Sequence, residues 1–160
     1  MVGTPKITAS EDVIPLTAQD VLRFKGGQVH TASPDQPILE AAQSLARHSL
    51  GSLLVVKDDL IVGILSERDI LRAMALDFEG LRKLRVSDLM TERVIVGLVD
   101  ESLDSLMAVM TEKRIRHMPI VSDGKLAGIL SIGDIVKAKA QHAEAAVHYL
   151  TEYIGGTYPS

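Results

Sequence analysis

The sequence predicts a mixed α/β (α+β) fold made of two β-α-β-β-α repeats packed sheet to sheet. Residues 63–70 read Gly-Ile-Leu-Ser-Glu-Arg-Asp-Ile, and residues 128–135, 65 positions later, read Gly-Ile-Leu-Ser-Ile-Gly-Asp-Ile. The same offset aligns residues 29–70 with residues 94–135 without a gap. One such unit is too small to cover both faces of its own sheet. We therefore expect each copy to bury one sheet face against the other copy.

Each copy begins with a short β-prone segment, residues 29–31 or 94–96, and continues into a stretch with helical periodicity. In both stretches apolar residues recur at i, i+3, i+4 and i+7, which predicts a helix with one apolar face. These residues are Ile38, Ala41, Ala42 and Leu45 in the first copy, and Leu103, Leu106, Met107 and Met110 in the second.

A β-hairpin and a second helix complete each copy. The predicted strands are residues 53–57 and 61–65 in the first copy, and 118–121 and 126–130 in the second. Their connections, Asp58-Asp59 and residues 122–125, have the composition of hairpin turns. The second helix is expected to begin at Ser66 in the first copy and at Ser131 in the second.

The remaining segments give the domain organisation. A short helix is expected from Thr17 to Lys25, ending at Gly26-Gly27, and a C-terminal helix is expected over 141–154, ending at Gly155-Gly156. Residues 86–91 link the two units. The expected parts are an N-terminal segment (1–25), a first domain (26–85), a second domain (86–140) and a C-terminal helix and tail (141–160).

Composition excludes several classes of function. The 46% hydrophobic and 24% charged residues indicate a globular chain, and the 3% aromatic content makes its core aliphatic. The net charge of −4 argues against a general nucleic-acid binder. Cysteine is absent, which excludes disulfides, zinc-thiolate sites and thiol nucleophiles. Neither a membrane span nor a secretory signal is visible, so we expect a cytoplasmic protein without a membrane partner.

The repeated motif resembles a known family, the CBS domain pair or Bateman module, in its stand-alone bacterial form. The resemblance rests on both Gly-Ile-Leu-Ser-x-x-Asp-Ile segments, on Met90-Thr91, and on the segment Arg-Ile-Arg-His-Met-Pro-Ile-Val at 114–121. It extends from about Thr17 to Ile154. It implies a disc-like module with two clefts, adenosyl ligands (AMP, ADP, ATP, NAD(H) or S-adenosylmethionine), homodimerisation, and a conformational signal to a regulated partner protein.

Two readings apply to Ser66-x-x-Asp69 and Ser131-x-x-Asp134. From the residues alone, each is a capping box at the start of a helix. By resemblance, Asp69 and Asp134 accept hydrogen bonds from the two ribose hydroxyls, and the serine lies near the phosphate. A carboxylate suits a cis-diol, and a helix N-terminus suits an anion.

The two clefts are expected to differ in charge. By resemblance, Arg116 and His117 point towards a bound phosphate, whereas Lys113 and Arg114 are better explained as a solvated basic helix end. The first copy has Gly51-Ser52 at the positions of Arg116 and His117. The first cleft must therefore either borrow positive charge, for which Arg68 is the local candidate, or bind something less anionic.

The complete set of candidate nucleotide-binding residues comes from both copies. It comprises Thr31, Ser66, Arg68, Asp69, Arg116, His117, Met118, Pro119, Ser131, Gly133 and Asp134. At the position of Thr31 the second copy has Val96, which leaves the role of a side chain there open.

The predicted function is a regulatory, ligand-sensing module and not an enzyme. The sequence contains no metallohydrolase spacing among its histidines, no phosphate-binding glycine loop and no nucleophile elbow, so no catalytic residue and no metal are expected. The alternative is a non-catalytic dimerisation or interaction protein whose clefts stay empty. The apolar replacements in the second copy, Thr31 by Val96 and Ser33 by Leu98, favour that alternative.

Overall fold

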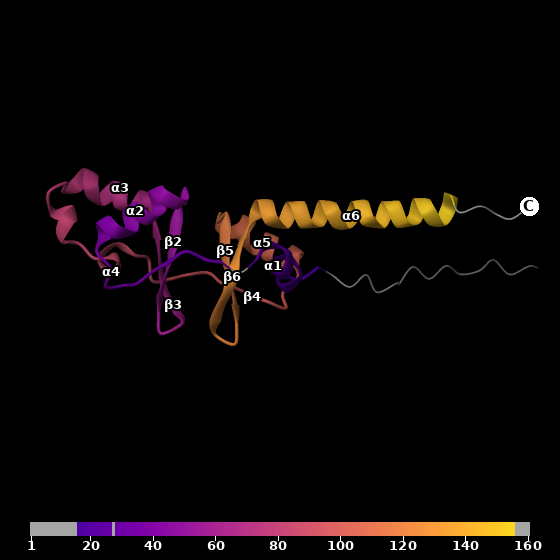
Figure 1. The fold of residues 1–160 in the computed structure, drawn as a ribbon, viewed down its shortest axis with the longest axis horizontal. Helices are drawn as coiled ribbons and strands as arrows, with labels where there is room; N and C mark the ends of the chain where they lie inside the picture. Colours follow the sequence, from indigo (N-terminus) through magenta and orange to yellow (C-terminus); the bar gives the residue numbers. More distant parts are fainter. Residues whose placement is uncertain (1–15, 27, 156–160) are drawn as a thin grey trace, which may run out of the picture.

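The computed structural model describes residues 16–26 and 28–155, so Gly27, Gly156 and the two chain ends lie outside the described residues. It contains two three-stranded sheets, each with the order first-second-third strand, and it confirms the predicted fold class. Figure 1 shows the two sheets next to each other in the middle of the molecule, with helices on their outer sides. Strand β3 (Leu60–Ser66) of one sheet is in contact with strand β6 (Lys125–Ser131) of the other.

The 65-residue offset holds for most elements of the two units. The first unit contains β1 (Thr31–Ala32), α2 (Ile38–His48), β2 (Ser52–Lys57), β3 and α3 (Glu67–Leu76). The second contains β4 (Gly97–Leu98), α5 (Leu103–Lys113), β5 (His117–Ser122), β6 and α6 (Ile132–Gly155). In each unit the first strand pairs in parallel with the second, and the hairpin strands pair antiparallel.

Turn and cap residues explain where the elements end. Asp58 and Asp59 both have positive φ, as do Asp123 and Gly124, which is the geometry of tight hairpin turns. Helices α2 and α5 both end at a residue in the left-handed conformation, Ser49 and Arg114. The two hairpin connections are therefore confirmed as turns.

The first strand of the second unit begins later than expected. The sequence predicted β structure at 94–96, but the strand is Gly97–Leu98, with Gly97 opposite Ile120. The first unit shows a similar displacement, because β1 begins at Thr31, the last residue of the predicted segment 29–31. Before the second segment, Thr91 is hydrogen-bonded to Ile64 of the first unit, in both directions at 2.9 Å. The chain then has to cross to the second unit before it can join the second sheet.

The helix that precedes each unit in the sequence packs on the other unit: α1 (Ala18–Lys25) on the second unit and α4 (Val86–Leu89) on the first. Helix α1 belongs by sequence to the N-terminus, yet Ala18 and Val21 are part of the second unit's core. The linker helix α4 places Val86 in the first unit's core. A short 3₁₀ helix, η1 (Gly80–Lys83), precedes α4.

Two equivalent glycines make room for this exchange. A Cβ on Gly63 would lie 2.7 Å from the sulfur of Met90, and a Cβ on Gly128 would lie 2.5 Å from Cδ2 of Leu22. Because both strands lack a side chain there, Leu22 of α1 covers β6 in the way that Met90 covers β3. The glycines of the repeated motif are thus explained by close packing.

Helix α6 is longer than either element predicted for its region. It runs without a break from Ile132 to Gly155, so the boundary expected at 140/141 falls inside it. Only its first part packs on the second unit, where Ile135 is fully buried. The rest extends away from the body of the molecule (Figure 1). No helix of the described residues has the length and hydropathy needed to cross a membrane.

Candidate functional site

The repeated serine and aspartate residues form the start of a helix in each unit. The Asp69 Oδ2 atom accepts from the Ser66 N–H at 2.9 Å, and the Ser66 hydroxyl accepts from the Asp69 N–H at 3.2 Å. The corresponding distances for Ser131 and Asp134 are 2.8 and 3.0 Å. The capping-box interpretation is therefore confirmed in both copies. In each aspartate the carboxylate oxygen that takes part is Oδ2.

The register of the hairpins brings further predicted residues to these helix starts. His117 is paired with Ser131 across β5 and β6, and Ser52 is paired with Ser66 across β2 and β3. The carbonyl of Arg116 accepts from the Ile132 N–H at 2.9 Å, as the Gly51 carbonyl does from the Glu67 N–H. Arg116 and His117 are exposed beside the start of α6. The second unit therefore has two basic side chains next to a capped helix N-terminus.

Asp134 differs from Asp69 in having an ion-pair partner. The Lys25 ammonium lies 2.6 Å from Asp134 Oδ2 and donates to the Ile129 carbonyl at 2.8 Å. Burial alone raises the pKa of the Asp134 carboxyl, but hydrogen bonds from Lys25 and Ser131 outweigh it and lower that pKa below its ordinary value. Asp134 is consequently ionised at neutral pH.

Lys25 was not among the residues predicted for the site. Seven positions separate Leu22 from Val29, but only four separate the equivalent Met90 from Val94. The longer connection lets α1 continue to Lys25, whereas α4 ends at Leu89. In the first unit the Ile64 carbonyl accepts a hydrogen bond from the Thr91 N–H. In the second unit the equivalent carbonyl, that of Ile129, accepts one from the Lys25 side chain instead.

Lys25 lines two separate cavities. The first, of about 250 Å³, lies between the two units and contains His117 together with Gly51 and Ser52. Its complete lining is Lys25, Gly26, Gln28, Val29, His30, Leu50, Gly51, Ser52, His117 and Ile129. Gln28 and His30 were not predicted, and the ring of His30 stacks on that of His48 with centroids 3.8 Å apart. The interunit cavity thus brings His117 of the second copy together with Gly51 and Ser52, the equivalent positions of the first copy.

The second cavity, of about 320 Å³, lies between α1 and α6 and contains Asp134. It is lined by Val21, Phe24, Lys25, Asp134, Lys137, Ala138 and Gln141. The Phe24 side chain is 93% exposed, which is unusual for an aromatic residue. Among the described residues, Lys25 is thus the one that the linings of these two cavities share.

Several of the other predicted residues lie elsewhere. Met118 and Pro119 are buried, and Met118 belongs to the second unit's core, so their side chains are committed to packing. Thr31 is exposed in β1 and lines neither cavity. Arg68 lines a separate cavity on α3 with Glu67, Ile70, Leu71 and Met74. Gly133 is exposed in the first turn of α6, two residues after the N-cap Ser131.

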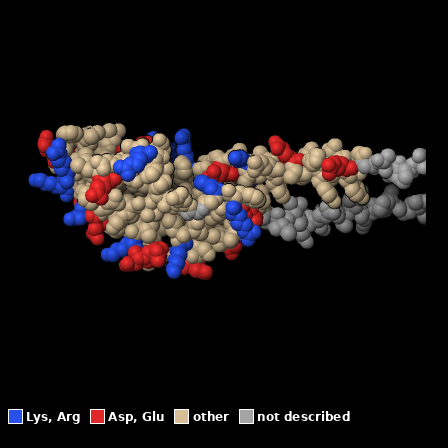
Figure 2. All heavy atoms as spheres, viewed as in Figure 1, with Lys and Arg blue, Asp and Glu red and all other residues tan. Residues whose placement is uncertain are grey.

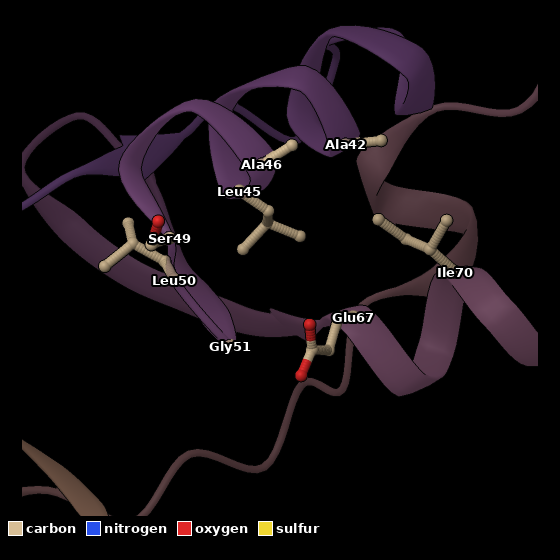
Figure 3. A pocket seen from close by; sticks show the side chains of 8 residues that line it. All are labelled: Ala42, Leu45, Ala46, Ser49, Leu50, Gly51, Glu67 and Ile70. Carbon is tan, nitrogen blue, oxygen red and sulfur yellow. The ribbon is translucent and has the colours of Figure 1, made fainter.

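A further cavity of about 430 Å³ lies between α2 and α3 (Figure 3). Apart from Glu67, Ser49 and Gly51, its lining is aliphatic, and Leu45 and Ile70 face each other across it. The groove has one acidic and no basic side chain, so it does not suit a phosphate. No group of three or more potential metal ligands occurs in the described ranges.

The ionised Asp134 has a predicted effect on pH stability. Because its folded-state pKa is lowered, its stabilising ion pair is complete above the unfolded value of about 3.9 and is lost as the pH falls through the lower folded-state value. Urea unfolding of the wild type and the Asp134→Asn variant should therefore differ more at pH 7 than at pH 3. An equal difference at both pH values would contradict this assignment of the charge.

The fold and these paired helix starts define a duplicated α/β module, and comparison with known proteins identifies its family. The CBS domain model matches residues 20–76 and 86–141. The chain therefore belongs to the CBS domain family and contains two CBS domains.

Solved structures of CBS-domain proteins have the same fold. The CBS-domain containing protein ATU1752 from Agrobacterium tumefaciens is 40% identical, with a TM-score of 0.69 over 78% of this chain and 99% of that one. CBSX2 in complex with AMP is 28% identical, with a TM-score of 0.67 over 79% and 98%. The CBS domain pair of MJ0100, in complex with 5′-methylthioadenosine and S-adenosyl-L-methionine, is 27% identical, with a TM-score of 0.66 over 80% and 98%. Adenosyl compounds are thus the ligands of two similar modules.

Proposed function

We propose that this chain is a regulatory module that binds an adenine nucleotide of the AMP type at its second CBS domain. Asp134 would accept hydrogen bonds from the two ribose hydroxyls. Arg116, His117 and the start of α6 would bind the phosphate. The single observation that carries the proposal is the position of the ionised Asp134, next to a cavity and one helical turn from the His117–Ser131 pair. The adenosyl ligands of the two similar structures support the same chemistry.

Lys25 has a defined part in this proposal. In the structure its ammonium is paired with Asp134, and Lys25 lines both the Asp134 cavity and the His117 cavity. A ribose that uses both oxygens of Asp134 would displace Lys25 from Oδ2, and the released ammonium would then pair with the phosphate. Lys25 would therefore favour a phosphorylated ligand over a neutral nucleoside, because only the phosphate offers it a new anionic partner.

The Lys25→Met variant tests this role. It keeps the length and apolar stem of the side chain but removes the charge. We expect tighter binding of adenosine, because Asp134 is free, and a smaller preference for AMP over adenosine, measured by titration calorimetry. Arg23→Met on the same helix, whose side chain lines neither cavity, serves as the control. An unchanged ratio of the two affinities would contradict the proposed role of Lys25.

The salt dependence of binding tests the phosphate contact. Exposed charges are screened over about 10 Å at 0.1 M salt, so AMP held by Arg116 and His117 should bind more weakly as the ionic strength rises. Adenosine has no phosphate and should not lose affinity, because salt also weakens the Lys25–Asp134 ion pair that the ribose displaces. The measurement is a pair of titrations at low and high salt. Equal salt dependence of the two ligands would exclude a phosphate contact with basic side chains.

The proposed role is binding without catalysis, with the consequence of binding passed to a regulated protein. Helix α1 carries Lys25 and packs on the second unit, so it is the element of the fold that ligand entry would affect most directly. The alternative, an interaction protein with empty clefts, finds support in the aliphatic groove between α2 and α3. Nucleotide titrations distinguish the two, because the alternative requires no binding.

A further inference from the structure

The two parts of α6 use different faces of the same helix. In the first part, Ile132, Ile135 and Ala138 pack on the core of the second unit, and Lys139 forms an ion pair with Asp104. From residue 141 to residue 155 every residue is exposed. Figure 1 shows this part extending away from both sheets, and Figure 2 shows only a few charged side chains along it. The second part of the helix therefore has no packing partner among the described residues.

An apolar stripe continues along the outward part of α6 on a face that the module does not cover. Its members follow each other at intervals of four, three, four, three and four residues, which is the a/d spacing of a coiled coil. The α6 stripe consists of Val136, Ala140, Ala143, Val147, Leu150 and Ile154. Val136, Val147, Leu150 and Ile154 are 52%, 63%, 55% and 79% exposed. No polar residue interrupts the stripe.

We propose that the α6 stripe pairs with the same stripe of a second copy of this chain, as a parallel two-stranded coiled coil. In the heptad register, β-branched Val147 and Ile154 occupy a positions and Leu150 occupies a d position, the combination that favours two parallel strands. Lys139 then lies at a g position and Glu144 at the following e position. Across a parallel pair these two side chains meet with opposite charge, and the three donors of the Lys139 ammonium allow it to keep Asp104 as well.

The stripe begins within the second CBS domain, at Val136 and Ala140, and its other four members lie beyond that domain. The family match ends at residue 141, whereas the stripe continues to Ile154. Pairing through it would place two modules at the same end of a helical stalk. The proposal is independent of nucleotide binding, because none of the stripe residues lines the Asp134 or the His117 cavity.

Introduced cysteines test the pairing directly, because the chain contains no cysteine of its own. In the parallel pair, Ala143 at a d position faces its own copy, whereas Ala145 lies at an f position on the outer side. We expect the full-length Ala143→Cys variant to form a disulfide-linked dimer of about 35 kDa, twice 17.3 kDa, under mild oxidation. The Ala145→Cys variant, with the same chemical change, should remain a monomer on the non-reducing gel.

A charge placed in the stripe supplies the second measurement. Leu150→Glu in the Ala143→Cys background should abolish the cross-linked band, whereas Ala145→Glu in the same background should leave it. Leu150 and Ala145 are exposed outside the module, so both variants should keep a folded module, which a circular dichroism spectrum verifies. Equal cross-linking of Ala143→Cys and Ala145→Cys, or cross-linking that survives Leu150→Glu, would overturn the proposal.

Discussion

Replacing Asp134 with alanine is expected to remove AMP binding. The variant loses both oxygens proposed to accept the ribose hydroxyls, while Arg116 and His117 remain. At a hundredfold excess over Kd, AMP should stabilise the wild type by about 2.7 kcal/mol. The same AMP concentration should leave the melting temperature of the Asp134→Ala variant unchanged.

Asp69→Ala provides the matched control for this experiment. Both substitutions remove the N3 acid of a capping box and should lower stability without ligand, and Asp134→Ala should lower it more because it also breaks the ion pair with Lys25. Only the Asp134 variant should also lose the effect of AMP, because basic side chains accompany the second site alone. If AMP stabilises the Asp134→Ala variant as much as the wild type, the ribose site has been placed wrongly.

Truncating Ile135 is expected to cost the most in stability. Ile135 is fully buried where α6 joins the second unit, and Ile→Ala at such a position typically costs about 2–5 kcal/mol. Its counterpart in the first repeat, Ile70, is only partly buried, so Ile70→Ala should cost clearly less. Urea unfolding of the two variants measures the difference. A larger loss for Ile70→Ala would contradict the description of α6 as anchored through Ile135.

The architecture could be predicted from the sequence because the two copies align without a gap. The offset between Ser66 and Ser131 places both helix starts, and the hairpins lie at the same offset. The start of the second unit was not accessible in this way. Residues 94–96 have β-prone side chains, but the hydrogen bonds between Thr91 and Ile64 hold the preceding chain on the first unit. A local pattern cannot reveal such a long-range connection.

The candidate site was predictable in part. The motif identified Asp134, and the register of the hairpin then brought Ser131 next to His117. The role of Lys25 depends on the packing of α1 against the second unit, which brings Lys25 to Asp134, 109 residues further along the chain. The one signal in the sequence was the longer connection between Leu22 and Val29, compared with the second repeat. The burial of Met118 likewise follows from the sheet packing and not from the motif.

The most direct test of nucleotide sensing is a thermal-shift panel on purified protein that has been verified to be free of bound ligand. The panel contains AMP, ADP, ATP, NAD, NADH, S-adenosylmethionine and adenosine, each over a range of concentrations. Because a ligand that binds only the folded state raises its stability, we predict a saturable increase in melting temperature with AMP, larger than the increase with adenosine. If no compound in the panel raises the melting temperature, the proposed nucleotide site is contradicted.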